Sequence, residues 1–401
     1  LSWMSAQLRS ASTALNVQFT KKGKPIVHRA AGIAPGARAA SADAGADAHR
    51  SSAPAIRAVG ISSVSTASGP LISLEHDRTK RVPIPPNEPH PFLQALGMQT
   101  SEGRIKSDMQ DKFQQINEFL KLLGHTRELE RLAEGRTSAP HAVSTGSLTA
   151  GVSSARPLCI LDCGCGSSHL TFGTYHYMSS VLGLPTCIMG VDTNAALMQK
   201  SNDFCRTLGL APSDAEFFAA PILSFSPRSP PDVVLALHAC DTATDDALAL
   251  GIMQEAPIIM AVPCCHKHLH KQMAGKPPPE PFGPLMRHGI LRQRQLDMLT
   301  DTLRAQLLRV LGYKTDVVEF TSTEHTPRNL LLRAVRIEGG RASGPATAGS
   351  ASRARGLKQR GQLLQQYDNL KAFWGGVTPR LEELLAPQLR QLRDDLAAAG
   401  M

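Results

Sequence analysis

Aromatic residues are scarce in this sequence, at only 4% of its 401 residues. No apolar run approaches the roughly 18 residues that a membrane-spanning helix needs, which argues against a helical membrane protein. Acidic residues are almost missing from residues 1–70, where Asp43 and Asp47 are the only two. The rest of that segment is rich in Ala, Ser, Gly and Arg, which cannot bury a core and is typical of an organelle transit segment. We therefore expect residues 1–70 to be a low-complexity or targeting segment.

Positive charge exceeds negative charge, giving a net charge of +9. This surplus favours an anionic partner, for which RNA is the natural candidate, unless basic tails supply most of the charge. The eight cysteines all lie between positions 159 and 265. That placement does not resemble a secreted disulfide framework, so we expect a reducing, intracellular compartment, either cytoplasmic or organellar.

Apolar segments that alternate with helical patterns define the centre of the chain, residues 156–338. Such alternation predicts an α/β domain with a seven-stranded, mostly parallel sheet covered on both faces. The last two strands are joined by a short connection and are expected to form an antiparallel hairpin. The predicted strands are 158–162, 187–192, 214–218, 232–238, 257–262, 314–320 and 329–336.

Helical additions are expected on both sides of this domain. In the N-terminal extension, residues 71–155, apolar residues at helical spacing predict a helix over about 105–123 that covers the sheet, with Lys112 on its opposite side. Residues 339–356 are rich in Gly, Ala, Ser and Arg and are expected to be a linker. The C-terminal part, 357–401, is expected to form two helices, 357–373 and 380–398.

The first predicted strand runs into Asp162-x-Gly164-x-Gly166, which is the pattern of a buried parallel strand, a glycine turn and a helix start. Glycines let a ligand approach the backbone closely, and the following helix N-terminus favours an anionic group. A dinucleotide site would have a third glycine near position 169, where this chain has a histidine. The pattern therefore suits S-adenosylmethionine (SAM), although a glycine turn in another α/β protein remains the alternative.

An acid at the end of the second predicted strand supports the same ligand. Asp192 lies 28 residues beyond Gly164, where a carboxylate can accept hydrogen bonds from ribose hydroxyls. Asn194 lies two residues further on. We therefore predict Asp162, Gly164, Gly166, Asp192 and Asn194 as cofactor-binding residues.

Polar and sulfur-containing residues also follow the fourth and fifth predicted strands. Ligands bind outside the carboxyl ends of the strands in an open α/β sheet, so these residues belong to the candidate site. The fourth strand is followed by His238, Cys240 and Asp241, and the fifth by Pro263-Cys264-Cys265-His266-Lys267. Core packing alone would not produce this pattern.

Several of these segments together resemble a methyltransferase-like family described as SAM-dependent methyltransferases. The His-x-Cys and Cys-Cys-His segments also resemble tRNA 2′-O-methyltransferases, except that a lysine is missing before His238 and that Lys267 replaces a histidine. The resemblance implies a class I, Rossmann-like methyltransferase fold, SAM as methyl donor and an RNA substrate. The segments that show this resemblance are Asp108–Phe113, Asp162–Gly166, Leu237–Asp245, Pro263–Lys267 and Glu324–Asn329.

Four interpretations of the cysteine and histidine cluster remain open. His238, Asp241 and Lys267 can position and deprotonate an acceptor for in-line methyl transfer, and we predict them as the catalytic residues. Cysteine can also add covalently to a pyrimidine, or simply pack as a small buried hydrophobe. We expect no metal; the alternative is a zinc site, whose ligands would be Cys240, Cys264, Cys265 and His266.

The sequence thus predicts a SAM-dependent methyltransferase that acts on RNA, either tRNA or rRNA. The alternatives are a protein or small-molecule methyltransferase, and a catalytically silent SAM-binding scaffold in an RNA–protein assembly. Residues 285–311 are a further candidate for RNA contact, because one predicted helix there carries Arg287, His288, Arg292, Arg294, Arg304 and Arg309. An ordinary solvated helix is the alternative there.

Overall fold

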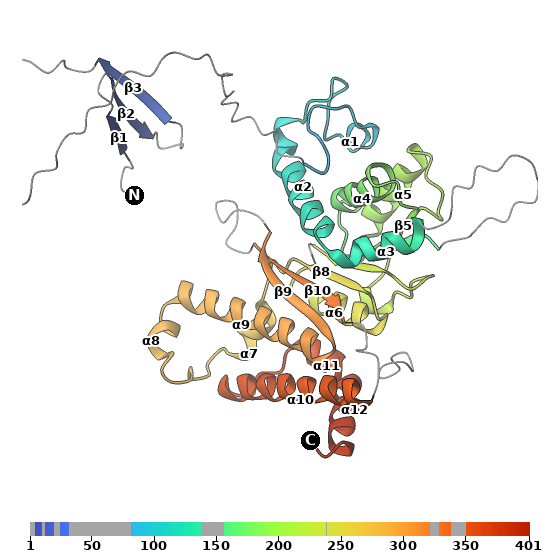
Figure 1. The fold of residues 1–401 in the computed structure, drawn as a ribbon, viewed down its shortest axis with the longest axis vertical. Coiled ribbons are helices and arrows are strands. Elements are labelled where there is room, and N and C mark those ends of the chain that lie inside the picture. Colours follow the sequence, from blue (N-terminus) through green and yellow to red (C-terminus); the bar gives the residue numbers. More distant parts are fainter. Residues whose placement is uncertain are drawn as a thin grey trace, which may run out of the picture. The chain divides into compact units, whose positions relative to one another are not determined.

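The computed structural model describes residues 5–9, 13–19, 25–31, 82–137, 156–237, 239–320, 329–337 and 350–401. The chain divides into two compact units, residues 1–75 and 76–401 (Figure 1). Among the described residues, no helix is both long enough and apolar enough to cross a membrane.

The first unit contains a three-stranded antiparallel sheet, in the order β1-β2-β3. Backbone pairing joins Ala6 to Val17 and Val17 to Val27. The expectation of a low-complexity or targeting segment over residues 1–70 did not include this sheet. The three strands are short, and their few apolar residues are hidden in a composition dominated by Ala and Ser. Their bounds are β1 Ser5–Arg9, β2 Thr13–Phe19 and β3 Pro25–Ala31.

A seven-stranded sheet organises the second unit, in the order β6-β5-β4-β7-β8-β10-β9. Strands β6, β5, β4, β7 and β8 pair in parallel, while β10 is antiparallel to both β8 and β9. All seven predicted strands are confirmed to within two residues, as is the antiparallel last hairpin. The bounds are β4 Leu158–Cys163, β5 Thr186–Asp192, β6 Ala215–Ala219, β7 Val233–Ala236, β8 Ile258–Ala261, β9 Tyr313–Glu319 and β10 Leu330–Arg336.

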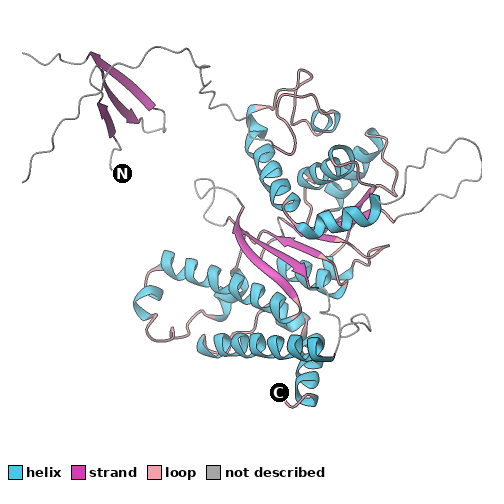
Figure 2. Ribbon diagram, viewed as in Figure 1, coloured by secondary structure: helices cyan, strands magenta, loops and turns pink. Residues whose placement is uncertain are grey.

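Helices cover both faces of this sheet (Figure 2). The first group comprises α1 Pro91–Ala95, α2 Gln110–Gly124, α3 Arg127–Thr137, α4 His169–His176 and α5 Ala195–Thr207, with the 3-10 turn η1 Ser107–Met109 and the π-helical turn η2 Tyr177–Val181. The second comprises α6 Thr242–Met253, α7 Lys267–Gln272, α8 Gly283–Met286, α9 Gly289–Val310, α10 Ser350–Phe373, α11 Arg380–Leu384 and α12 Ala386–Ala398, with the 3-10 turn η3 Ile222–Ser224.

The alternation of side chains along each strand separates two hydrophobic cores. On β4, Ile160 belongs to the core shared with α2, α4 and α5, while its neighbour Leu161 belongs to the core shared with α6, α9 and α12. Both residues are completely buried. Burial on both faces explains why the central strands read as continuous apolar runs.

The structure changes some of the predicted boundaries outside the sheet. Helix α10 begins at Ser350, inside the expected linker 339–356, and the predicted helix 380–398 is divided into α11 and α12. Pro387 lies in the first turn of α12, a position where proline is favoured because its missing N–H needs no partner. Helix α3 is an additional helix in the N-terminal extension, which the sequence did not predict.

Candidate active site

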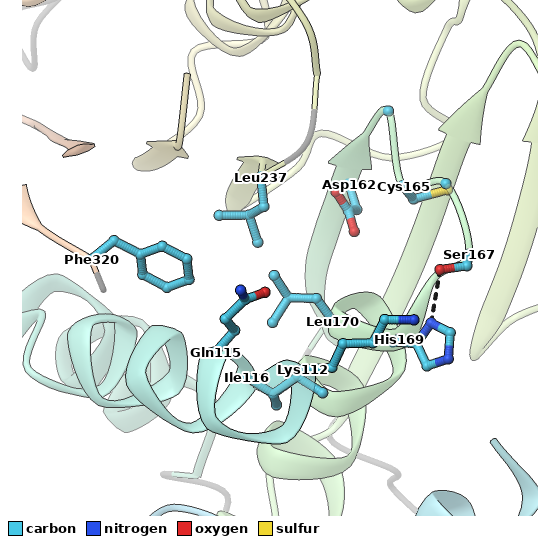
Figure 3. A pocket seen from close by; sticks show the side chains of 12 residues that line it. Lys112, Gln115, Ile116, Asp162, Cys165, Ser167, His169, Leu170, Leu237 and Phe320 are labelled. Carbon is cyan, nitrogen blue, oxygen red and sulfur yellow. Dashed lines mark hydrogen bonds between the residues drawn. The ribbon is translucent and has the colours of Figure 1, made fainter. Parts of the chain in front are cut away.

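A cavity of about 300 Å³ opens at the carboxyl end of β4. In the sheet order β6-β5-β4-β7-β8, the chain leads from β4 to β5 on one side and from β7 to β8 on the other. The crevice between β4 and β7 is therefore the topological switch point where ligands bind in such sheets. Figure 3 shows side chains from both sides of that crevice and from α2. The lining residues are Lys112, Gln115, Ile116, Asp162, Gly164, Cys165, Gly166, Ser167, His169, Leu170, Leu237 and Phe320.

Asp162 brings a buried carboxyl group to this cavity. Its side chain accepts a hydrogen bond from the Thr171 hydroxyl at 2.5 Å. Burial is the main cause that raises the pKa of Asp162 to about 6, and the nearby charge of Asp192 adds to this, while the Thr171 hydrogen bond opposes it. A buried carboxylate with one hydroxyl donor is well placed to bind a cationic group.

The turn after β4 depends on glycine at two positions. Gly164 and Gly166 have φ angles of 73° and 52°, in the left-handed region that other residues rarely adopt. A Cβ on Gly164 would also lie 3.3 Å from Cα and Cβ of Ala239. The turn thereby presents backbone rather than side chains to the cavity, which is what a closely held ligand needs.

Asp192 holds this turn from the end of β5. Its Oδ2 accepts the N–H of Gly166 at 3.0 Å, and its Oδ1 accepts the N–H of Asn194 at 2.9 Å. The Asn194 side chain accepts the N–H of Leu197 at 3.1 Å and caps α5. Asp192 and Asn194 do not line the cavity themselves; they stand behind the glycine turn that does.

The polar groups that line the cavity carry complementary charges. Lys112, from α2, supplies a cation and Asp162 supplies an anion (Figure 3). The amino-acid end of SAM has an ammonium and a carboxylate, so these two side chains and the backbone of the turn match its charges. His169 also lines the cavity, and burial lowers its pKa, with Lys112 and Lys200 contributing in the same direction. Its Nδ1 lies 2.8 Å from the Ser167 hydroxyl.

The predicted catalytic residues lie apart from this lining. Asp241 precedes α6, and its Oδ1 accepts the N–H of His268 at 2.9 Å. Lys267 is exposed at the start of α7. Neither residue lines the cavity, and His238 lies outside the described residues. Asp241 and Lys267 do share the carboxyl edge of the sheet, and their catalytic role stays a prediction.

His266 belongs to a buried ionic network, not to the cysteine cluster. Its Nε2 lies 2.9 Å from Oδ2 of Asp301 on α9. Asp301 also accepts from Arg304 at 3.1 Å, and Arg304 donates twice to Asp245 on α6, at 2.9 and 2.7 Å. Arg304 is only 1% exposed, which corrects its inclusion in a possible RNA-contacting surface. This network joins α6, α7 and α9 behind the carboxyl edge.

The sulfur atoms of three cysteines do come together. Cys240 and Cys264 place their Sγ atoms 3.2 Å apart, and Cys264 and Cys265 place theirs 3.9 Å apart. Three of the four residues in the alternative zinc set therefore lie close together, whereas the fourth, His266, contacts Asp301 instead.

Lys112, Gln115 and Phe320 are cavity residues that the sequence interpretation did not identify. Lys112 is solvent-accessible, as its position opposite the apolar side of the helix predicted. What sequence periodicity does not give is the direction in which α2 crosses the sheet edge. The resemblance over Asp108–Phe113 was the one available signal.

Comparison with known proteins gives a family match and several similar structures. A family model described as a methyltransferase domain matches residues 111–272. The chain is similar to an rRNA methylase from Streptococcus thermophilus, at 11% identity and a TM-score of 0.29, over 45% of this chain and 87% of that one. It is also similar to a methyltransferase from Podospora anserina with S-adenosylhomocysteine bound, at 11% identity and a TM-score of 0.29, over 45% and 72% of the two chains. No curated protein matches.

The matched region begins within α2 and ends with α7, so it contains Lys112, the glycine turn and Asp192. The glycine turn, the buried Asp162 and Lys112 form one cavity at its switch point. Residues 111–272 are a methyltransferase domain, for which SAM is the methyl donor.

Proposed function

We propose that this methyltransferase modifies RNA, either tRNA or rRNA, by in-line transfer of the methyl group to a positioned nucleophile. The observation that carries the proposal is the net charge of +9, because each phosphate neutralised by Lys or Arg releases a counterion and strengthens binding. Residues 1–75 contain eight Lys and Arg but three Asp and Glu, so they supply more than half of this charge. In this proposal the basic N-terminal segment itself contacts the RNA, and the catalytic domain adds the exposed cations described next.

Exposed cations also lie beside the carboxyl edge of the sheet. Lys267 is exposed at the start of α7, and Arg287, Arg292 and Arg294 are exposed around the start of α9. We assign the three arginines to phosphate contacts, which orient an RNA without reading its sequence.

SAM supplies a methyl group on a sulfonium centre, whose transfer requires a nucleophile in line with the breaking bond. In this proposal the protein positions the methyl acceptor and accepts the proton that the acceptor loses. Asp241 and Lys267 follow β7 and β8, which lie in order beside β4, and hold the acceptor or its proton at this edge. Positioned acids and bases typically contribute about 10²–10⁴-fold to a rate.

The test is transfer of a labelled methyl group from SAM to total RNA and, in parallel, to total protein. We expect label in the RNA fraction that ribonuclease removes. Asp241→Ala and Lys267→Ala should lower the rate by about 10²–10⁴-fold. SAM affinity should change little, since neither residue lines the cavity. Label in protein alone would contradict the RNA assignment, and full activity in both variants would contradict the catalytic one.

A charge variant tests the RNA contact separately. Lys21, Lys22 and Lys24 lie between β2 and β3 in the sequence. Replacing all three by glutamine should weaken RNA binding and reduce the salt dependence, whose slope is about 0.7 per phosphate contacted on a single strand. SAM binding should be unaffected. RNA binding that does not change with salt concentration would point to another class of substrate.

A further inference from the structure

Three thiols meet at the carboxyl edge of the sheet, outside the SAM cavity. The Sγ atoms of Cys240, Cys264 and Cys265 all lie within 4.8 Å of one another. Cys240 follows β7 and the other two follow β8, so two neighbouring parallel strands deliver them. Thiols that are 24 residues apart in the sequence are thus brought together by the sheet itself.

The local backbone allows both adjacent cysteines to contribute. On an extended strand Cys264 and Cys265 would point to opposite faces. Strand β8 ends at Ala261, however, and residues 262–266 form neither strand nor helix. Their sulfur atoms are consequently 3.9 Å apart and both close to that of Cys240.

The spacing of the sulfur atoms matches that of a zinc–thiolate site. Zinc–sulfur bonds of about 2.3 Å in a tetrahedral arrangement separate the sulfur atoms by roughly 3.8 Å. The two measured separations, 3.2 and 3.9 Å, lie on either side of that value.

We propose that Cys240, Cys264 and Cys265 form a three-thiolate zinc site. Structural zinc sites are closed by four protein ligands, whereas sites with three leave a position for water or substrate. Cys240 is exposed, so the site is accessible from solvent, and His266 is excluded because Asp301 holds it. This assignment does not depend on whether the methyl acceptor is RNA.

The experiment measures zinc in the full chain, purified under reducing conditions without chelators. We expect about one equivalent by elemental analysis, and replacement by Co²⁺ should give sulfur-to-cobalt charge-transfer absorption. Cys240→Ser and Cys265→Ser should each lose the metal and the absorption. Cys205→Ser and His266→Asn are the matched controls and should keep both.

Zinc should also slow alkylation of Cys240, Cys264 and Cys265 in the unsubstituted protein, which gives a readout that does not depend on how the variants fold. Fully reduced protein that binds neither metal at stoichiometry would overturn the proposal. So would metal binding that survives Cys240→Ser and Cys265→Ser but is lost in His266→Asn.

Discussion

The carboxylate of Asp192 accepts the N–H of Gly166 at 3.0 Å, which ties the end of β5 to the glycine turn after β4. Losing a hydrogen-bonded charged acceptor typically costs about 1.5–3 kcal/mol. Asp192→Ala should therefore weaken SAM binding at least about tenfold, measured by calorimetry, and should also lower the unfolding temperature, because the N–H groups of Gly166 and Asn194 lose their acceptor. Asp192→Asn keeps an oxygen acceptor without the charge, so its affinity should fall between those of the unsubstituted protein and Asp192→Ala. Unchanged affinity in Asp192→Ala would remove this residue from the site.

Lys112 is the cation among the cavity-lining residues, and we expect it to bind the carboxylate of SAM. Lys112→Met keeps most of the side-chain length but removes the charge and should weaken SAM binding about tenfold, on the scale of one charged hydrogen bond. Lys121→Met is the matched control, because Lys121 lies on the same helix and pairs with Glu118 at 2.7 Å. Equal effects of the two substitutions would contradict a specific role for Lys112.

SAM affinity should depend on pH through Asp162. Its pKa of about 6 means that the carboxyl is largely protonated at pH 5 and ionised at pH 7. A cationic ammonium binds the ionised form, so affinity should increase as pH rises through about 6 and then level off. His169 loses its proton over a lower pH range, because its pKa is lowered. That loss of positive charge weakens its attraction for the carboxylate of SAM, so it lowers SAM affinity as the pH rises. Calorimetry between pH 5 and 8 measures this dependence.

Two variants test which residue causes the pH dependence of SAM affinity. Asp162→Asn should abolish the rise in affinity near pH 6, and His169→Gln should leave it in place. A rise that persists unchanged in Asp162→Asn would contradict the assignment to Asp162.

The ionic network behind the carboxyl edge should be important for stability. Arg304 is buried and donates to Asp245 and Asp301, so Arg304→Met would leave two buried carboxylates without their cation. Removing one partner of such a network costs about 3–5 kcal/mol. Denaturant unfolding at neutral pH measures this loss. Arg294→Met is the control on the same helix, where the side chain is exposed. Equal stabilities would show that the network contributes little.

The sequence predicted the sheet well because the relevant signal is local. Ile160 and its neighbours form short apolar runs that end at glycines and acids, and such runs define buried parallel strands wherever they occur. The glycine turn was found for the same reason, since Gly164 and Gly166 follow one of these runs directly.

The rest of the site depends on packing that no local pattern contains. Lys112 reaches the cavity because α2 crosses the sheet at one particular angle. His266 was grouped with its cysteine neighbours because they are adjacent in the sequence, yet a carboxylate 35 residues away determines its position. Composition favoured a low-complexity or targeting segment over residues 1–70, because composition describes a whole segment and not three short strands.

Calorimetric titration with S-adenosylhomocysteine tests the central claim, that the cavity after β4 holds the cofactor. We expect one binding site per chain in the unsubstituted protein. Gly164→Val should abolish binding while the protein still unfolds cooperatively, because this position has a φ angle of 73° and a Cβ would lie 3.3 Å from Ala239. No binding to the unsubstituted protein, or equal binding to a folded Gly164→Val variant, would contradict the claim.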